Sequence, residues 1–240
     1  MVVATGSVPK AVELKSVSKS YAGTPPVSAL SDVSISVSRG EFLGIIGASG
    51  SGKTTLLHIV GTLTNPTSGS VFINGLDTAG MPDRVLAGVR SKYIGFVFQE
   101  YFLLPGFTAT ENVENGLLYS GISSSERRER AEAMLERVDL SHRLTHLPSE
   151  LSGGEQQRVA IARALVHHPS FILADEPTGN VDSKNTESLM ELLVSLNDEG
   201  TTIILITHDL DVAAVSKRQV TLRDGRIISD SSVQQGSVHD

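Results

Sequence analysis

The chain has 240 residues, a net charge of −7, no cysteine and 40% hydrophobic residues. These values predict a globular chain of one large domain or two closely joined ones. The acidic balance argues against a nucleic-acid partner, and the absence of cysteine excludes disulfides and thiolate metal ligands. The chain shows no secretory signal and no run of roughly 18 apolar residues that could span a membrane. Any membrane role is therefore expected to come through a partner.

The first strands are predicted between residues 11 and 37, where apolar and polar residues alternate, as in Val33-Ser34-Ile35-Ser36-Val37. This period of two is typical of half-buried antiparallel strands. The run Phe42–Ile46 is almost continuously apolar, and so are the runs at 171–174 and 202–206. Such runs predict parallel strands that are covered on both faces.

A glycine-rich segment follows the apolar run at 42–46 and precedes the helical pattern at 54–63. It matches G-x-x-x-x-G-K-[ST], a loop whose backbone N–H groups surround phosphate oxygens while its lysine adds a positive charge. The alternative is an ordinary Gly/Ser turn before a helix, which the strand-loop-helix context disfavours. The expected nucleotide-binding residues are Gly47, Ala48, Ser49, Gly50, Ser51, Gly52, Lys53, Thr54 and Thr55, with the Thr54 hydroxyl also placed on Mg²⁺.

Turns and helices are predicted along the rest of the chain. Asn74-Gly75 and Asp224-Gly225 have the composition of hairpin turns. A helical insert is expected over about 100–165, with Ser123 and Glu126 at capping-box spacing. Leucines at helical spacing over 189–196 end before Gly200, a predicted C-terminal cap. The segments 1–10 and 231–240 are expected to be flexible tails.

Two adjacent acids, Asp175 and Glu176, follow the apolar run at 171–174. Ligand crevices of open α/β sheets lie at this end of the strands. Asp175 suits the binding of Mg²⁺, and Glu176 suits the polarisation of the water that attacks the γ-phosphate. The alternative is an acid-rich first turn of a helix.

The segment Leu151-Ser152-Gly153-Gly154-Glu155-Gln156 opens another helical pattern ahead of the acid pair. It resembles the signature of ABC ATPases, and the resemblance covers residues 11–228. It implies a single α/β P-loop NTPase domain over 1–240 that binds ATP and Mg²⁺ and hydrolyses ATP. This fold has a mainly parallel sheet, an N-terminal antiparallel β subdomain and a helical subdomain at about 100–165. The catalytic core then covers about 11–99 and 166–228.

The resemblance also implies roles for single residues. Tyr21 would stack on adenine, Gln99 would reach the metal or the water, and His208 would contact the γ-phosphate. Core packing is the alternative for Tyr21, and a structural role is the alternative for His208. Ser152, Gly153 and Gly154 of the signature would face ATP held by a second copy. Glu155 and Asp182, the latter in a segment that resembles the D-loop, would also belong to the nucleotide-binding residues. His58, His142, His146, His167 and His168 match no site of the family.

Within the family, Gly95–Gln99 and Thr178–Asp182 look like the MacB, LolD and FtsE branch. Ala48 replaces the commoner proline and Val181 the commoner leucine. This resemblance implies a head-to-tail dimer bound to a permease at the cytoplasmic face of the membrane. The permease would dock on the apolar residues Phe102, Leu103, Leu104 and Phe107, for which core packing is the alternative.

Two other classes remain as alternatives for the whole chain. One is a soluble ABC ATPase of DNA repair or translation, and the other is a regulatory module that binds ATP but barely hydrolyses it. The paired domains or long coiled coils of the first are not found in this sequence. The second fits poorly with an intact set of Lys53, Asp175, Glu176 and His208.

Overall fold

The structure is a computed structural model that describes residues 9–234, so most of the expected tails lie outside the described residues. Its larger sheet has six strands in the order β10-β9-β3-β8-β7-β6. All neighbouring pairs are parallel except β10 with β9. The mainly parallel α/β core predicted from the sequence is therefore confirmed. The strands are β3 (Phe42–Ile46), β6 (Ile94–Val97), β7 (Phe171–Asp175), β8 (Ile203–Thr207), β9 (Arg218–Arg223) and β10 (Arg226–Asp230).

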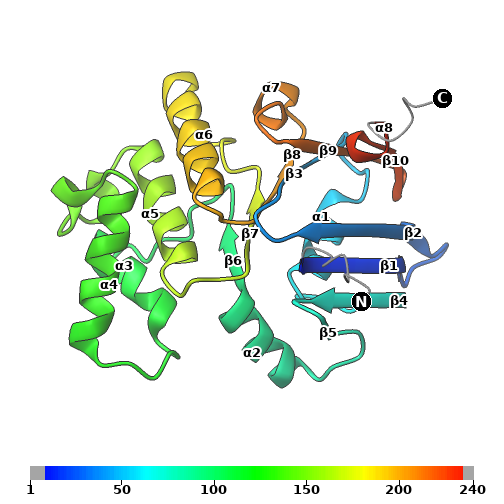
Figure 1. Cartoon of the computed structure of the whole chain (residues 1–240), viewed down its shortest axis with the longest axis horizontal. Helices are drawn as coiled ribbons and strands as arrows, with labels where there is room; N and C mark the ends of the chain where they lie inside the picture. Colours follow the sequence, from blue (N-terminus) through cyan, green and yellow to red (C-terminus); the bar gives the residue numbers. More distant parts are fainter. Residues whose placement is uncertain (1–8, 235–240) are drawn as a thin grey trace, which may run out of the picture.

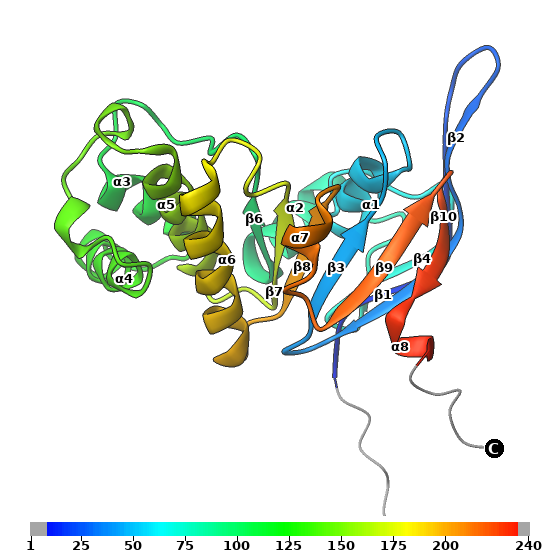
Figure 2. The ribbon, with the colours of Figure 1, turned by 90° about the horizontal axis from the view of Figure 1, so that it is seen from above.

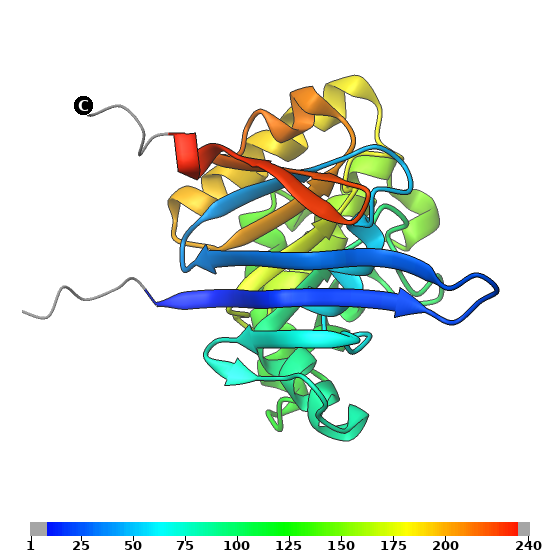
Figure 3. The same cartoon turned by 90° about the vertical axis from the view of Figure 1, so that its right-hand side faces the viewer.

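The second sheet is antiparallel and has the order β2-β1-β4-β5. Figure 3 shows its long strands running side by side across the front of the molecule. In β1, Leu14 and Val17 are both buried although they are three residues apart. A register shift lies between them, where Ser16 has φ 48°, and such a bulge resets the alternation of faces. The strands are β1 (Lys10–Tyr21), β2 (Val27–Ser38), β4 (Ser68–Ile73) and β5 (Leu76–Asp77).

The two predicted hairpin turns are present. Asn74 and Gly75 have φ values of 52° and 82°, and Asp224 and Gly225 have values of 48° and 72°. A two-residue type I′ turn needs positive φ at both positions, which Asn-Gly and Asp-Gly sequences accept best. The turns join β4 to β5 and β9 to β10.

Residues 9–234 contain eight α-helices. Helices α3, α4 and α5 gather at one end of the molecule, and the antiparallel sheet lies at the other (Figure 1). Residues 100–165 are largely helical. Residues 231–234, which the sequence assigned to a tail, form a short helix. The helices are α1 (Lys53–Val60), α2 (Asp83–Tyr93), α3 (Ala109–Glu114), α4 (Ser124–Arg137), α5 (Gly153–Leu165), α6 (Ser183–Asp198), α7 (Leu210–Ala213) and α8 (Ser231–Gln234).

Helix α4 begins as the sequence predicts, because the Ser123 hydroxyl accepts a hydrogen bond from the Glu126 N–H. The reciprocal bond of a capping box is missing, however. The Glu126 carboxylate instead pairs with Arg130, one turn further along the helix, at 2.6 Å. An exposed glutamate can form either contact at small cost, so spacing alone does not decide between them.

Strand β7 separates two hydrophobic cores. Ile172 and Ala174 pack into the core that includes the helical end of the molecule. Phe171 and Leu173 pack into the core between the two sheets. Successive side chains of a strand point to opposite faces, so a fully apolar strand is needed where both faces are buried.

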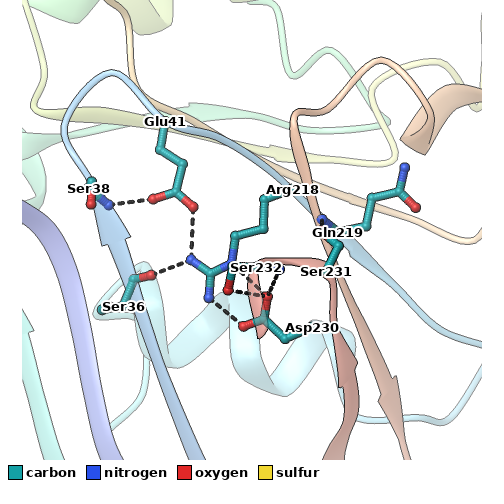
Figure 4. Close-up of polar contacts among 8 residues, drawn as sticks. All are labelled: Ser36, Ser38, Glu41, Arg218, Gln219, Asp230, Ser231 and Ser232. Atoms are coloured by element: carbon teal, nitrogen blue, oxygen red, sulfur yellow. Dashed lines mark hydrogen bonds and ion pairs between the residues drawn. The ribbon is translucent and has the colours of Figure 1, made fainter. Parts of the chain in front are cut away.

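Arg218 fastens the C-terminal hairpin to the rest of the fold (Figure 4). Its Nε and Nη2 donate to the two carboxylate oxygens of Asp230 at 2.8 and 2.5 Å. Its Nη1 donates to the Ser36 carbonyl and to Glu41 Oε1, each at 2.8 Å. The hydrogen bonds from Arg218 lower the pKa of Asp230 to about 2. The guanidinium thus joins β9 and β10 to the junction of β2 and β3.

Candidate active site

The glycine-rich loop lies between the end of β3 and the start of α1. Gly52 has φ 104°, and a Cβ atom there would lie 2.6 Å from the Ala29 carbonyl oxygen. A Cβ atom at Gly47 would lie 2.5 Å from the Leu222 carbonyl oxygen. Neither position has room for a side chain, so the loop needs glycine at both. By contrast, a Cβ atom at Gly50 would have nothing within 4 Å, and this side of the loop is open.

Lys53 reaches back across the loop. Its Nζ donates to the carbonyl oxygens of Gly47 and Ala48 at 2.6 and 3.0 Å. Thr54, the next residue, is exposed in the first turn of α1. A lysine charge, a helix N-terminus and an open loop side together fit a group with several phosphate oxygens.

Asp175 is the last residue of β7, and Glu176 follows it with φ 45°. Burial, followed by the nearby charge of Glu176, raises the pKa of Asp175, while His58 and Lys53 act in the opposite direction. The Glu176 N–H donates to the Ile206 carbonyl at 2.8 Å. The two acids therefore have different surroundings, with Asp175 in the field of the loop lysine and Glu176 beside β8.

The Glu176 carboxylate is held by the end of β8. Nδ1 of His208 lies 2.7 Å from Oε1, and the backbone N–H of His208 donates to the same oxygen at 3.1 Å. The buried Thr207 hydroxyl donates to Oε2 at 3.1 Å. The His208 side chain is 71% exposed, whereas that of Glu176 is 19% exposed. Three donors thus orient the carboxylate, and one of them is the accessible imidazole of His208.

Gln99 lies just after β6 and close to the segment that follows Glu176. A Cβ atom at Gly179 would lie 2.7 Å from Gln99 Nε2. The Asn180 side chain donates to the Gln99 carbonyl at 3.1 Å. The Tyr101 hydroxyl donates to the Asn180 carbonyl at 2.8 Å. The structure therefore places Gln99 against the segment at 179–180 that follows the acid pair, and Tyr101 is a supporting residue that the sequence did not indicate.

The signature turn begins α5 with a complete capping box. The Ser152 N–H donates to Glu155 Oε2 at 2.8 Å, and the Glu155 N–H donates to Ser152 Oγ at 3.3 Å. Arg143 Nε donates to Glu155 Oε1 at 2.8 Å. Gly153 lies so near Tyr101 that a Cβ atom would be 2.7 Å from its hydroxyl. The turn is therefore a capped helix N-terminus, and the backbone N–H groups of the first turn of a helix point outward along its axis.

The signature turn at 152–155 and the glycine-rich loop at 47–55, called the phosphate loop below, are not brought together within this chain. Figures 1 and 2 show α5 and α1, which begin at these two segments, on opposite sides of β6 and β7. No hydrogen bond among residues 9–234 joins residues 152–155 to the loop at 47–55. The N-termini of α5 and α1 therefore lie at separate places in the chain's fold.

Two further residues that the sequence singled out are Tyr21 and Asp182. Tyr21 ends β1 with 41% of its surface exposed, so it is not a core tyrosine. Lys19 Nζ lies 5.2 Å from the centre of its ring. Asp182 caps α6 by accepting from the N–H and the side-chain amide of Asn185, and these bonds lower its pKa.

Arg163 supports the segment after Gln99, a role that the sequence did not indicate. Its guanidinium donates to the carbonyl oxygens of Tyr101 and Phe102 at 2.8 and 2.5 Å. Burial lowers its pKa. Phe102, Leu104 and Phe107 are 59%, 38% and 47% exposed, whereas Leu103 packs against the core. The core-packing alternative therefore fails for three of these four apolar residues.

The comparison with known proteins agrees with this geometry. The family described as "ABC transporter" matches residues 30–179, which is more than half of the chain. The chain belongs to the ABC transporter family. It is 48% identical over 225 residues to an uncharacterized ABC transporter ATP-binding protein, YknY, of Bacillus subtilis, covering 93% of this chain and 98% of that one.

Other ABC transporter proteins extend the comparison. The Pseudomonas aeruginosa pyoverdine export ATP-binding/permease protein PvdT is 49% identical over 98% of this chain, which spans 36% of that protein. The Hyphomonas neptunium macrolide export ATP-binding/permease protein MacB is 47% identical over 97% of this chain, again 36% of that protein. These relatives agree with the MacB, LolD and FtsE branch.

Solved ABC cassettes share the fold. The ATP-binding cassette MJ0796, in a dimeric post-hydrolysis state with ADP and Pi, matches with a TM-score of 0.83 at 44% identity. The match covers 91% of this chain and 97% of that one. This ABC chain is thus an ATP-binding transporter subunit of a family that hydrolyses ATP. The DNA-repair alternative gains no support from these relatives.

Proposed function

We propose that two copies of this chain bind MgATP between them and hydrolyse it to drive a membrane permease. The observation that carries the proposal is the Glu176 carboxylate, held by Thr207 and His208 beside Asp175 and the phosphate loop. A carboxylate fixed in this way can orient and polarise a water molecule next to a bound phosphate.

The loop residues Gly47 to Thr55 would hold the phosphates, and Lys53 would exchange its bonds to loop carbonyls for bonds to phosphate oxygens. Thr54 and Asp175 would hold Mg²⁺, with Gln99 reaching the ion or the water. No group of three His, Cys, Asp or Glu side chains in the described part of the chain could hold a metal alone. This fits an ion that takes several oxygens from phosphates and water. When bound, Mg²⁺ would neutralise charge on the transferred phosphate.

His208 and Glu176 would act together. Oε1 of Glu176 accepts from both the backbone and the ring of His208, whereas Oε2 accepts from Thr207. If the exposed imidazole turns towards a γ-phosphate, Oε1 loses one of its two donors and gains room for a water. The backbone N–H and the Thr207 hydroxyl still hold the carboxylate in place during that change.

The separation of the signature turn from the phosphate loop supports a dimer. A second copy in head-to-tail arrangement would place Ser152 to Glu155 opposite the loop of its partner, and Asp182 and Tyr21 would complete the nucleotide site. The MJ0796 cassette, 44% identical, is described as dimeric. Most of the ligating groups of one ATP then come from one chain and the signature from the other.

The permease would dock on the exposed apolar residues Phe102, Leu104 and Phe107. PvdT and MacB are named as combined ATP-binding and permease proteins, and this chain matches about a third of each. No helix of residues 9–234 is long and apolar enough to cross a membrane. We infer that the chain works at the cytoplasmic face of the membrane through a separate or attached permease, whose residues decide the cargo.

Sedimentation of the Glu176→Gln chain with and without MgATP tests the shared site. This variant should hydrolyse ATP slowly, because glutamine is a poor base. It should therefore form a dimer with ATP and return to a monomer when ATP is removed. The Glu176→Gln/Lys53→Ala double variant is the matched control and should stay monomeric, because it lacks the loop lysine. An ATP-saturated monomer would contradict the proposal.

A further inference from the structure

A groove of about 1190 Å³ lies between α6 and α7. Figure 2 shows the two helices side by side on one face of the six-stranded sheet. The apolar side chains that line the groove come from both helices and the segments next to them. They are Val181, Met190, Val194, Val212 and Val215.

The rim of the groove is strongly acidic. No lysine or arginine is among its lining residues. Asp198 pairs with Lys217 at 2.9 Å, and Glu199 pairs with Arg137. The acids on the rim are Glu187, Glu191, Asp198, Glu199, Asp209 and Asp211.

Four of these acids have no cationic side chain beside them. Within residues 9–234, no Lys, Arg or His nitrogen lies within 4.0 Å of the carboxylates of Glu187, Glu191, Asp209 or Asp211. Glu187 and Glu191 are both exposed and stand four residues apart on α6. Like charges at this spacing repel each other and destabilise a helix slightly. A cationic partner would remove this repulsion.

The groove continues to the catalytic residues. Gln99, Glu176 and His208 line its end near the strand termini. It shares no lining residue with the proposed permease surface of Phe102, Leu104 and Phe107. A molecule in the groove would therefore contact α6 and the active site without occupying the permease surface.

We propose that this groove binds a cationic amphipathic helix of a partner protein. The 16 residues of α6 extend over about 24 Å, so the groove offers room beside it for a helix of several turns. Leucine-type side chains of the partner would cover the apolar floor, and its lysines or arginines would face Glu187, Glu191 and Asp211. The charge of the rim favours this partner over an acidic segment or an anionic lipid surface.

The probe is a fluorescein-labelled 18-residue peptide of leucine and lysine at helical spacing, with a scrambled peptide of equal composition as its control. Binding is measured by fluorescence anisotropy, and contacts are mapped by hydrogen exchange on the full chain. The helical peptide should bind tighter than the scrambled one and protect residues 186–199 and 209–215. Equal binding of both peptides, or protection only elsewhere, would overturn the proposal.

Charge variants distinguish peptide binding at the groove from a general effect of the net charge of the chain. Glu187→Lys/Glu191→Lys should weaken peptide binding by about tenfold or more, and Glu187→Gln/Glu191→Gln should weaken it less. The matched control, Glu129→Lys/Glu136→Lys, changes the net charge equally through two exposed acids of α4 and should change binding by less than about threefold. Equal losses in both lysine variants would contradict the proposal. Displacement of the peptide by spermine at equal concentration would also contradict it.

Discussion

Nδ1 of His208 lies 2.7 Å from Oε1 of Glu176, although the two residues stand 32 positions apart in the chain. The contact forms because β7 and β8 are parallel neighbours and both residues follow the carboxyl ends of these strands. Parallel strands bring their carboxyl ends to one edge of the sheet, where ligands of such folds bind. Glu176 and His208 therefore meet at the proposed reaction centre.

Replacement of His208 by alanine should lower the ATP turnover rate by about 10²- to 10³-fold, because a donor to the reacting phosphate and to Glu176 is lost. Steady-state phosphate release measures this. His168→Ala is the control, since His168 is exposed and lies outside the site. If both variants keep the wild-type rate, His208 has only a structural role.

Replacement of Lys53 by alanine should weaken ATP binding by about 10- to 100-fold, the effect of losing a charged donor to phosphate. Equilibrium binding of a fluorescent ATP analogue measures the dissociation constant. Lys92→Ala removes an exposed lysine of α2 and should leave it unchanged. An unchanged constant for Lys53→Ala would show that the loop does not hold the phosphates.

Replacement of Asp230 by asparagine should lower the free energy of unfolding by about 1 to 2 kcal/mol at pH 7, because the ion pair with Arg218 is lost. The pKa of Asp230 is about 2 in the folded chain, below the ordinary value of 3.8. This contribution is complete above pH 3.8 and is lost as the pH falls through about 2.

Urea unfolding between pH 7 and pH 3 measures this effect. The difference between wild type and Asp230→Asn should shrink towards pH 3, and Glu129→Gln, a change at an exposed helix position, should show no such trend. A difference that is zero at pH 7 would mean that Arg218 does not fasten the C-terminal hairpin.

Replacement of Phe107 by alanine should leave the ATPase rate of the isolated chain unchanged and abolish its stimulation by a co-purified permease. Phe107 is 47% exposed and contributes to the proposed docking surface. Leu76→Ala removes a similarly exposed apolar side chain, 41% exposed, on the antiparallel sheet. Full stimulation of the Phe107 variant would place the permease elsewhere.

The parts of the site that the sequence predicted are those encoded by neighbouring residues. The glycine-rich loop, the acid pair and both hairpin turns each depend on backbone conformations within a few positions. The parallel strands were predictable because burial on both faces requires continuous apolar runs. Chain-local patterns were therefore sufficient for the class of fold and for the position of the glycine-rich loop between β3 and α1.

The supporting contacts were not predictable, because they join distant segments. Tyr101 and Asn180 are 79 positions apart, and Arg163 is 61 positions from Phe102. No local pattern distinguishes these side chains from ordinary surface residues. Prediction from local patterns also fails for one contact between near neighbours. The Glu126 carboxylate does not complete the capping box, because it pairs with Arg130 instead. Tertiary packing and competing partners decide such contacts.

The most direct measurement is ATP turnover by the Glu176→Gln chain beside its ATP affinity. The structure predicts a fall in turnover of about 10²- to 10⁴-fold, with ATP binding retained, because glutamine keeps the shape of Glu176 but is a poor base. Undiminished turnover by Glu176→Gln would contradict the claim that this carboxylate orients the attacking water.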